Sequence, residues 1–314
     1  MSVLRAALSA LLFCALFANA AAQTPAPPID TAQAAIARHD YKGAIAILDG
    51  IVAQDPKNAR ALLLRGDAKD YLGDEKGAIT DYDAAIALEP GNAYAYATKC
   101  YSEVEIGSYV RAVADCTKSI ALNANNAFAY RGRANAHYFA GDLDAALADG
   151  KRATQIDPHD SYAFLTTCRT DAALGNLLQA AQDCTRSIAL QPSDNAYFAR
   201  GQTYVRLHDY TKAIADLRQS LAMNPANPSA FYWIAVSEAQ QKDALAAMTD
   251  INAYVRAAPN DGDGLMLRAV LEAKQGRVAA TRADAQEALR LYTLAHDDDG
   301  AKRAQSLLSS LPKP

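Results

Sequence analysis

The sequence contains few residues that break helices and no long block of like charge. It has 16 glycines and 12 prolines among 314 residues, and its 31 basic and 35 acidic residues give a formal net charge of −4. Because nucleic acids and anionic membranes attract clustered basic residues, neither is expected as a partner. The low glycine and proline content, with abundant alanine, leucine and aspartate, favours a helical protein.

Residue patterns of known catalytic sites are also missing. The sequence has no GxxxxGK(S/T) phosphate loop and no GxSxG nucleophile elbow. None of the five histidines is followed by a second histidine or a cysteine three or four residues later, as a helical metal site would need. The sequence therefore predicts a non-catalytic protein with no cofactor and no metal site.

The only strongly apolar stretch lies at the N-terminus, which reads MSVLRAALSALLFCALFANAAAQ. Arg5 precedes an apolar run over residues 6–17, and small residues over 18–22 provide a cleavage site. This pattern predicts a secretory signal peptide over 1–22, followed by a short linker over 23–30. An uncleaved anchor is the alternative, but the run is shorter than the roughly 20 residues that a spanning helix needs. A lipoprotein is disfavoured because Phe13 stands before Cys14, where a small residue is expected.

After cleavage, the rest of the chain offers no further segment for crossing a membrane. The expected location is therefore the periplasm or the exterior of the cell, without stable membrane insertion.

The rest of the sequence is built on a unit of 34 residues. Within residues 59–92, apolar residues fall at helical spacing on both sides of Gly73-Asp74, which predicts two amphipathic helices joined by a tight turn. Small residues at positions 8, 20 and 27 of the unit would let the two helices approach closely, and a proline at position 32 would end the second helix. Position 20 recurs as Ala44, Ala78, Ala112, Ala146, Ala180, Ala213 and Ala247. Position 32 recurs as Pro56, Pro90, Pro158, Pro192, Pro225 and Pro259.

The length, the helix pair and the marker residues resemble the tetratricopeptide repeat (TPR) motif. The resemblance covers roughly residues 25–293 and implies an all-α, right-handed superhelical solenoid of about eight repeats, with the array proper over 31–293. The expected repeats are about 25–58, 59–92, 93–126, 127–160, 161–193, 194–227, 228–261 and 262–293. A capping helix over 297–312 would cover the last apolar face, and Asp297-Asp298-Asp299 would cap its N-terminus. A calcium loop is disfavoured because these carboxylates are consecutive rather than alternate.

The first helix of each repeat lines a concave groove in this family, mainly through positions 2, 5, 9, 12 and 13. The resemblance therefore implies a peptide-binding groove that contains Tyr94, Tyr101, Phe128, Arg131, Asn135, Tyr138, Tyr162, Arg169, Phe198, Gln202, Arg206 and Tyr232. Aromatic residues and arginine are enriched at binding hot spots. The alternative is that some of these rings, those at position 2 above all, pack between neighbouring repeats.

Arginines 131, 169 and 206 are expected to form a positive strip that favours an acidic peptide segment or a terminal carboxylate. The alternative is that they are solvated, or paired with carboxylates of the same face such as Asp67, Asp70 or Glu105.

Some members of the family hold a peptide's terminal carboxylate in a clamp of basic residues and asparagines. Arg131 and Asn135 match the first residues of such a clamp. Thr166, Asn195 and Ala199 replace the later ones, so a clamp of that kind is not expected.

Four cysteines repeat in register. Cys100 and Cys116 occupy positions 8 and 24 of one repeat, and Cys168 and Cys184 occupy the same positions two repeats later. Positions 8 and 24 are equidistant from the turn of the hairpin, so they should face each other, and an oxidising compartment would favour the bonds Cys100–Cys116 and Cys168–Cys184. The alternative is that these residues are small buried apolar side chains.

The resemblance implies a protein–protein interaction scaffold that binds a segment of a partner in its groove. Bacterial envelope systems for assembly, secretion or polysaccharide export are the expected context, with other envelope proteins as partners. A structural subunit docked by its convex face or its ends is the alternative, and an enzyme is the third.

Overall fold

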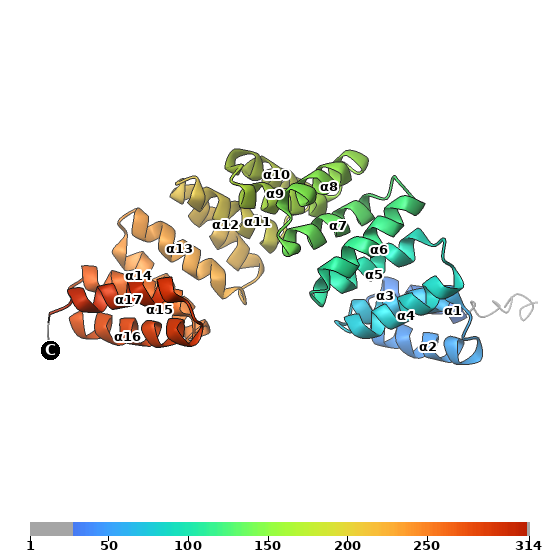
Figure 1. The fold of residues 1–314 in the computed structure, drawn as a ribbon, viewed down its shortest axis with the longest axis horizontal. Helices are drawn as coiled ribbons and strands as arrows, with labels where there is room; N and C mark the ends of the chain where they lie inside the picture. The colour runs from blue at the N-terminus through green and yellow to red at the C-terminus, as the bar shows by residue number, and fades with distance from the viewer. Residues whose placement is uncertain (1–27, 313–314) are drawn as a thin grey trace, which may run out of the picture. The chain divides into compact units, whose positions relative to one another are not determined.

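The computed structural model describes residues 28–312, and every regular element in this range is an α-helix. Figure 1 shows the helices as successive antiparallel pairs, one pair for each expected repeat. By its internal contacts the chain forms two compact units, which divide between Ala124 and Asn125. The signal peptide expected over 1–22 lies outside the described residues.

Unit 1 contains three helix pairs. Their bounds are α1 (Pro28–Ala37), α2 (Tyr41–Gln54), α3 (Ala59–Asp70), α4 (Glu75–Leu88), α5 (Ala93–Glu105) and α6 (Tyr109–Leu122). The linker expected over 23–30 therefore ends earlier than predicted, because α1 begins at Pro28, and proline is well tolerated in the first turn of a helix.

Unit 2 contains five helix pairs and a final single helix. Their bounds are α7 (Ala127–Ala140), α8 (Leu143–Ile156), α9 (Ser161–Leu174), α10 (Leu177–Leu190), α11 (Asp194–Arg206), α12 (Tyr210–Met223), α13 (Pro228–Gln240), α14 (Ala244–Ala257), α15 (Gly262–Lys274), α16 (Val278–Leu294) and α17 (Asp298–Ser310). Asp297 caps α17 by accepting a hydrogen bond from the backbone N–H of Gly300, and Ala304 of this helix is buried against the last repeat. None of the described helices is long and apolar enough to span a bilayer.

The helix boundaries follow from polar caps and left-handed turns. Most helices begin after an aspartate or asparagine whose side chain accepts the N–H of the third helical residue, as Asn58 does from Ala61. Each pair turns through a residue with positive φ, such as Gly73 at +79°. In the turns without glycine, His39, His208, Lys242 and His296 adopt this conformation.

Positions 8 and 24 meet across the hairpin in several repeats, as the sequence predicts. Gly66 lies so close to the ring of Tyr82 that a Cβ atom at residue 66 would stand 2.6 Å from it. Two repeats have cysteines at these positions instead. The structure pairs Cys100 with Cys116 and Cys168 with Cys184, with Cα–Cα distances of 5.5 and 5.3 Å. Both distances lie within the range of ordinary disulfides.

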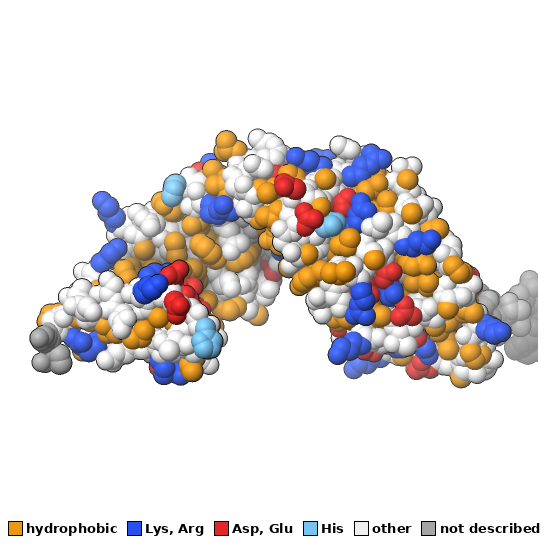
Figure 2. Space-filling model, viewed as in Figure 1, with side chains coloured by type: hydrophobic (Ala, Val, Ile, Leu, Met, Phe, Trp, Pro, Cys, Tyr) orange, Lys and Arg blue, Asp and Glu red, His pale blue; other side chains and the backbone are white. Residues whose placement is uncertain are grey.

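An ion pair that the sequence analysis did not predict also recurs between positions 7 and 23. The basic residue of the first helix meets an aspartate of the second helix, as in Arg133–Asp149 at 2.7 Å. The other members of the series are Arg65–Asp81, Lys99–Asp115, Arg200–Asp216 and Arg268–Asp284. Accordingly, basic and acidic side chains are interspersed on the visible face of each unit in Figure 2.

Candidate functional site

Two of the expected groove residues, Tyr94 and Tyr101, lie on α5 in unit 1. The hydroxyl of Tyr94 donates to Asp67 at 2.9 Å, and the buried Tyr82 donates to the other oxygen of the same carboxylate at 2.9 Å. Burial raises the pKa of Asp67, and the two hydroxyl bonds oppose that shift. Tyr94 thus joins neighbouring repeats through its hydroxyl, although half of the residue remains exposed.

The other ten lie in unit 2, on the first helices of four consecutive repeats, α7, α9, α11 and α13. Successive helices of this series are in contact. The structure separates the ten residues into a group that joins neighbouring repeats and a group that surrounds a cavity.

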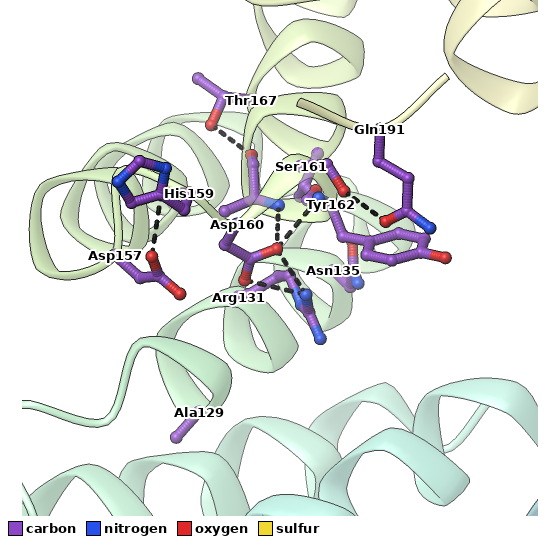
Figure 3. Close-up of polar contacts among 12 residues, drawn as sticks. Ala129, Arg131, Asn135, Asp157, His159, Asp160, Ser161, Tyr162, Thr167 and Gln191 are labelled. Carbon is purple, nitrogen blue, oxygen red and sulfur yellow. Dashed lines mark hydrogen bonds and ion pairs between the residues drawn. The ribbon is translucent and has the colours of Figure 1, made fainter. Parts of the chain in front are cut away.

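Arg131 belongs to the first group (Figure 3). Its Nη1 donates to both carboxylate oxygens of Asp160, at 2.7 and 2.8 Å. The same carboxylate caps α9 by accepting the backbone N–H groups of residues 162 and 163. The guanidinium also lies 5.2 Å from the ring of Phe128 and 5.3 Å from that of Tyr162. Arg131 is therefore paired, and its partner is the cap of the next repeat rather than Asp67, Asp70 or Glu105.

Three further groove candidates also contact neighbouring elements. The side-chain oxygen of Asn135 accepts the hydroxyl of Thr166 at 2.9 Å. Phe198 packs against the buried cluster formed by α11, α12 and α13. The ring of Tyr232 lies 5.4 Å from that of Tyr254, and Tyr232 lines a separate cavity beside α15.

The remaining four candidates line one cavity of 210 Å³, which we call the Arg169 cavity. Its walls come from α7, α9, α11 and α13, and they consist of Tyr138, Arg169, Ala172, Ala173, Ala199, Gln202, Thr203, Arg206 and Trp233. Sequence reasoning missed Trp233, because it stands at position 6 and the expected groove positions exclude that place. The sequence did offer one signal, because Trp233 is the only tryptophan in the chain.

Arg169 is the notable charge of this cavity. Its Nη2 donates to the side-chain oxygen of Asn195 at 3.2 Å, and it forms no ion pair with any residue of the described range. Burial lowers the pKa of its guanidinium, while the hydroxyl of Tyr138 and the carboxylate of Asp194 act in the opposite direction. Arg206 donates to the backbone carbonyl of Ala172 at the same cavity.

Two of the histidines stabilise turns between paired helices. His39 and His208 occupy left-handed turn positions, and the Nδ1 of each shares a hydrogen bond with the hydroxyl of the tyrosine two residues later. Within residues 28–312 no group of three or more His, Cys, Asp or Glu is arranged to hold a metal ion.

A sequence model of the tetratricopeptide repeat matches residues 29–96 and 198–262. Comparison with curated protein sequences finds no match.

Several solved structures have a similar fold. The Cut9–Hcn1 hetero-tetramer of APC/C matches with a TM-score of 0.69 and 18% identity over 86% of this chain, which spans about half (52%) of that chain. A tetratricopeptide repeat protein from Parabacteroides merdae matches with a TM-score of 0.59 and 17% identity over 79% of this chain and 98% of its own. PilW, described as a type IV pilus biogenesis factor, matches with a TM-score of 0.57 and 20% identity over 63% of this chain and 92% of its own.

Identities this low show the fold alone. The fold agrees with the 34-residue period, with the paired helices and with the matching repeat model. The chain has an all-α solenoid fold, and two of its segments, residues 29–96 and 198–262, match the tetratricopeptide repeat family.

Proposed function

We propose that this protein is a non-catalytic scaffold that binds a segment of a partner protein along α7, α9, α11 and α13. The tetratricopeptide fold supports a role in protein interaction. The observation that favours this surface is the Arg169 cavity, where a partly buried guanidinium has no carboxylate partner among the described residues and aromatic side chains line the walls. Arginine and aromatic residues around a partly desolvated hollow are typical of binding hot spots.

We place the protein in the bacterial envelope, in a system for assembly, secretion or polysaccharide export. The N-terminal sequence has the pattern of a signal peptide, and two disulfide-bonded cysteine pairs favour an oxidising compartment. The similar fold of PilW supports an assembly context, although at 20% identity it does not identify the pathway.

The test compares partner capture by three forms of the full chain. The native protein, the Arg169→Gln variant and the control Arg256→Gln are each used to capture partners from the native envelope. Arg256 is an exposed residue in the last turn of α14, so the control removes the same charge away from the cavity. We expect the partner to be lost with Arg169→Gln and kept with Arg256→Gln, at unchanged helical content by circular dichroism. Equal capture of the partner by both variants would show that the binding site lies outside this groove.

A structural subunit docked by its outer face is the second candidate, and one observation favours it. A hollow of 560 Å³ lies between α10, α11 and α12, lined by Leu178, Ala181, Gln182, Thr185, Tyr204, Leu207, Asp209 and Lys212. Leu178 is 72% exposed, which is unusual for a large apolar side chain that has no partner to cover it. If Leu178→Asp abolishes capture while Arg169→Gln does not, this second candidate replaces the first.

A further inference from the structure

We propose that Asp171, Asn176, Gln179 and Asp183 form a binding site for a calcium ion beside the turn between α9 and α10. The site shares no residue with the lining of the Arg169 cavity, so the inference is independent of the proposed groove function. It departs from the sequence-based expectation of no metal site, because two carboxylates and two amides match no known metal-binding motif.

The absence of a basic partner is the first argument. Four repeats place acids at both position 11 and position 23, and three of these pairs contact a basic side chain. The contacts are Lys99–Asp115 at 3.0 Å, Arg218–Asp250 at 2.6 Å and Arg268–Asp284 at 2.6 Å. The fourth pair, Asp171 and Asp183, forms no ion pair with any described residue. Thr167 occupies position 7, which is basic in two of the other three repeats, and its hydroxyl donates to a backbone carbonyl at 2.8 Å instead.

The burial of Asp171 is the second argument. The residue is 1% exposed, and one of its carboxylate oxygens receives no hydrogen bond within the described range. The other oxygen accepts the side-chain amide of Asn176 at 2.9 Å. Burial and the charge of Asp171 raise the pKa of Asp183, while a hydrogen bond from Gln179 at 3.1 Å lowers it. A buried carboxylate oxygen without a donor, beside a second carboxylate, needs a proton or a cation.

The chemistry of the surrounding groups favours the cation. Calcium accepts about 6–8 oxygen ligands from carboxylates, side-chain carbonyls and water in irregular arrangements. The amides of Asn176 and Gln179 already contact the two carboxylates, and a half-turn of each would present its oxygen in place of its nitrogen. Calcium would neutralise both carboxylates, whereas a shared proton would leave one negative charge without a counter-charge.

A hollow of 510 Å³ adjoins the pair and has room for water ligands. Its polar lining consists of Asp171, Asn176, Gln179 and Lys151. Lys151 occupies the place that Arg218 has two repeats later, but it acts on Asp183 only at longer range. Its amino group therefore opposes a cation at this site without replacing it.

Calcium titration of the full chain tests the proposal, by calorimetry at about pH 8, where protons compete least. We expect a dissociation constant of about 0.1–1 mM, the range of weak extracellular calcium modules. Calcium at about 5 mM should raise the Tm by about 2–4 °C relative to EDTA. Asp171→Asn and Asp183→Asn should each weaken binding by about tenfold or more and abolish the rise in Tm.

Two further variants act as controls. Asp298→Asn removes an exposed carboxylate from the run of three aspartates at α17 and should leave the calcium affinity unchanged. Lys151→Gln removes the opposing charge and should tighten calcium binding by at least about twofold. Circular dichroism in EDTA checks that each variant keeps the native helical content.

Three results would overturn the proposal. Calcium that produces neither heat nor a change in the Tm of the native chain would show that the pair shares a proton instead. Binding that survives both asparagine variants at residues 171 and 183 would place the ion elsewhere. Binding that is lost with Asp298→Asn would place it at the aspartate run of α17.

Discussion

The stability of this protein should fall as the pH rises from about 5 to 8, because several acids are buried beside other acids. Glu103 of α5 is 1% exposed, and one of its carboxylate oxygens has no hydrogen-bond partner among the described residues. Burial and the charge of Asp115 raise its pKa to about 7. Glu238 of α13 repeats the arrangement beside Asp250, with its pKa also raised to about 7. Both glutamates occupy position 11 of their repeat and face the aspartate at position 23.

The sign follows from the direction of these shifts. A glutamate with a raised pKa in the folded state binds its proton more tightly there than in the unfolded chain, where its pKa is near 4.5. The resulting stabilisation is fully present below about pH 4.5 and is lost as the pH rises through 7. The full shift at 1.36 kcal/mol per unit sets an upper limit of about 3 kcal/mol for each acid. The nearby Lys99, Arg111 and Arg218 oppose the two shifts, and their effect is already contained in these pKa values. Screening by water reduces the contribution to about 1 kcal/mol each.

The assay is urea unfolding followed by circular dichroism at about pH 5 and pH 8, with the disulfides kept oxidised. The native protein should lose about 2 kcal/mol of unfolding free energy between the two pH values. The double variant Glu103→Gln, Glu238→Gln should lose much less, because glutamine remains neutral over the whole range. The control Glu105→Gln removes an exposed acid of the same helix and should keep the native pH dependence. A native protein that is equally stable or more stable at pH 8, or a double variant with the native slope, would refute this account of the acid pairs.

Four further results are expected. Alkylation and mass spectrometry of protein from its native compartment should find both cysteine pairs oxidised, and each bond should stabilise the fold by about 3 kcal/mol in the chain-entropy model; four free thiols would contradict this. Arg131→Ala should lower the unfolding free energy by about 2 kcal/mol in urea titrations, since it leaves the capping carboxylate of α9 without its counter-charge. An unchanged midpoint of urea unfolding would show that Arg131 does not stabilise the fold through this pair. Gly66→Ala should destabilise the protein by about 1–3 kcal/mol because its Cβ atom would clash with the neighbouring tyrosine ring. Gly50→Ala should instead stabilise α2 by about 0.5–1 kcal/mol in the same titration, because its Cβ atom would have no other atom within 4 Å. Intact mass of the purified secreted protein should place its N-terminus near Ala21 or Gln23, and retention of the first 20 residues would defeat the expected location.

The helix pairs were predictable from the sequence because the same types of residue recur at the same positions of successive repeats. Small residues at positions 8 and 20 and a proline near the end of most pairs recur often enough to locate the helix pairs. The pairing of cysteines was predictable for the same reason, since two positions equidistant from a turn must lie opposite each other. The contacts that these features predict lie within a single repeat.

The role of each arginine was not predictable, because it depends on contacts between repeats. Asn58, Asn92 and Asn126 cap the first helices of three successive repeats, and Asp160 stands at the equivalent place in the next one. Asp160 is thus a charged cap where the other three are neutral, and its charge makes it the partner of Arg131. The family pattern assigns position 5 to the groove without regard to the residue that caps the next repeat. It therefore could not predict the ion pair between Arg131 and Asp160.

The contrast between Arg131 and Arg169 is the strongest reason to look for function at the Arg169 cavity. Both are arginines on first helices, both are partly buried, and the sequence pattern treats them alike. The repeat supplies Arg131 with a carboxylate at 2.7 Å, as it does for the other partly buried basic residues on these helices. Arg169 has an amide instead, although a single replacement of Asn195 by aspartate would provide the charge. A carboxylate in direct contact would compensate the burial of this guanidinium better than Asp194 does, which acts on its pKa without forming an ion pair with it. Departures from an otherwise consistent local rule are expected at functional sites.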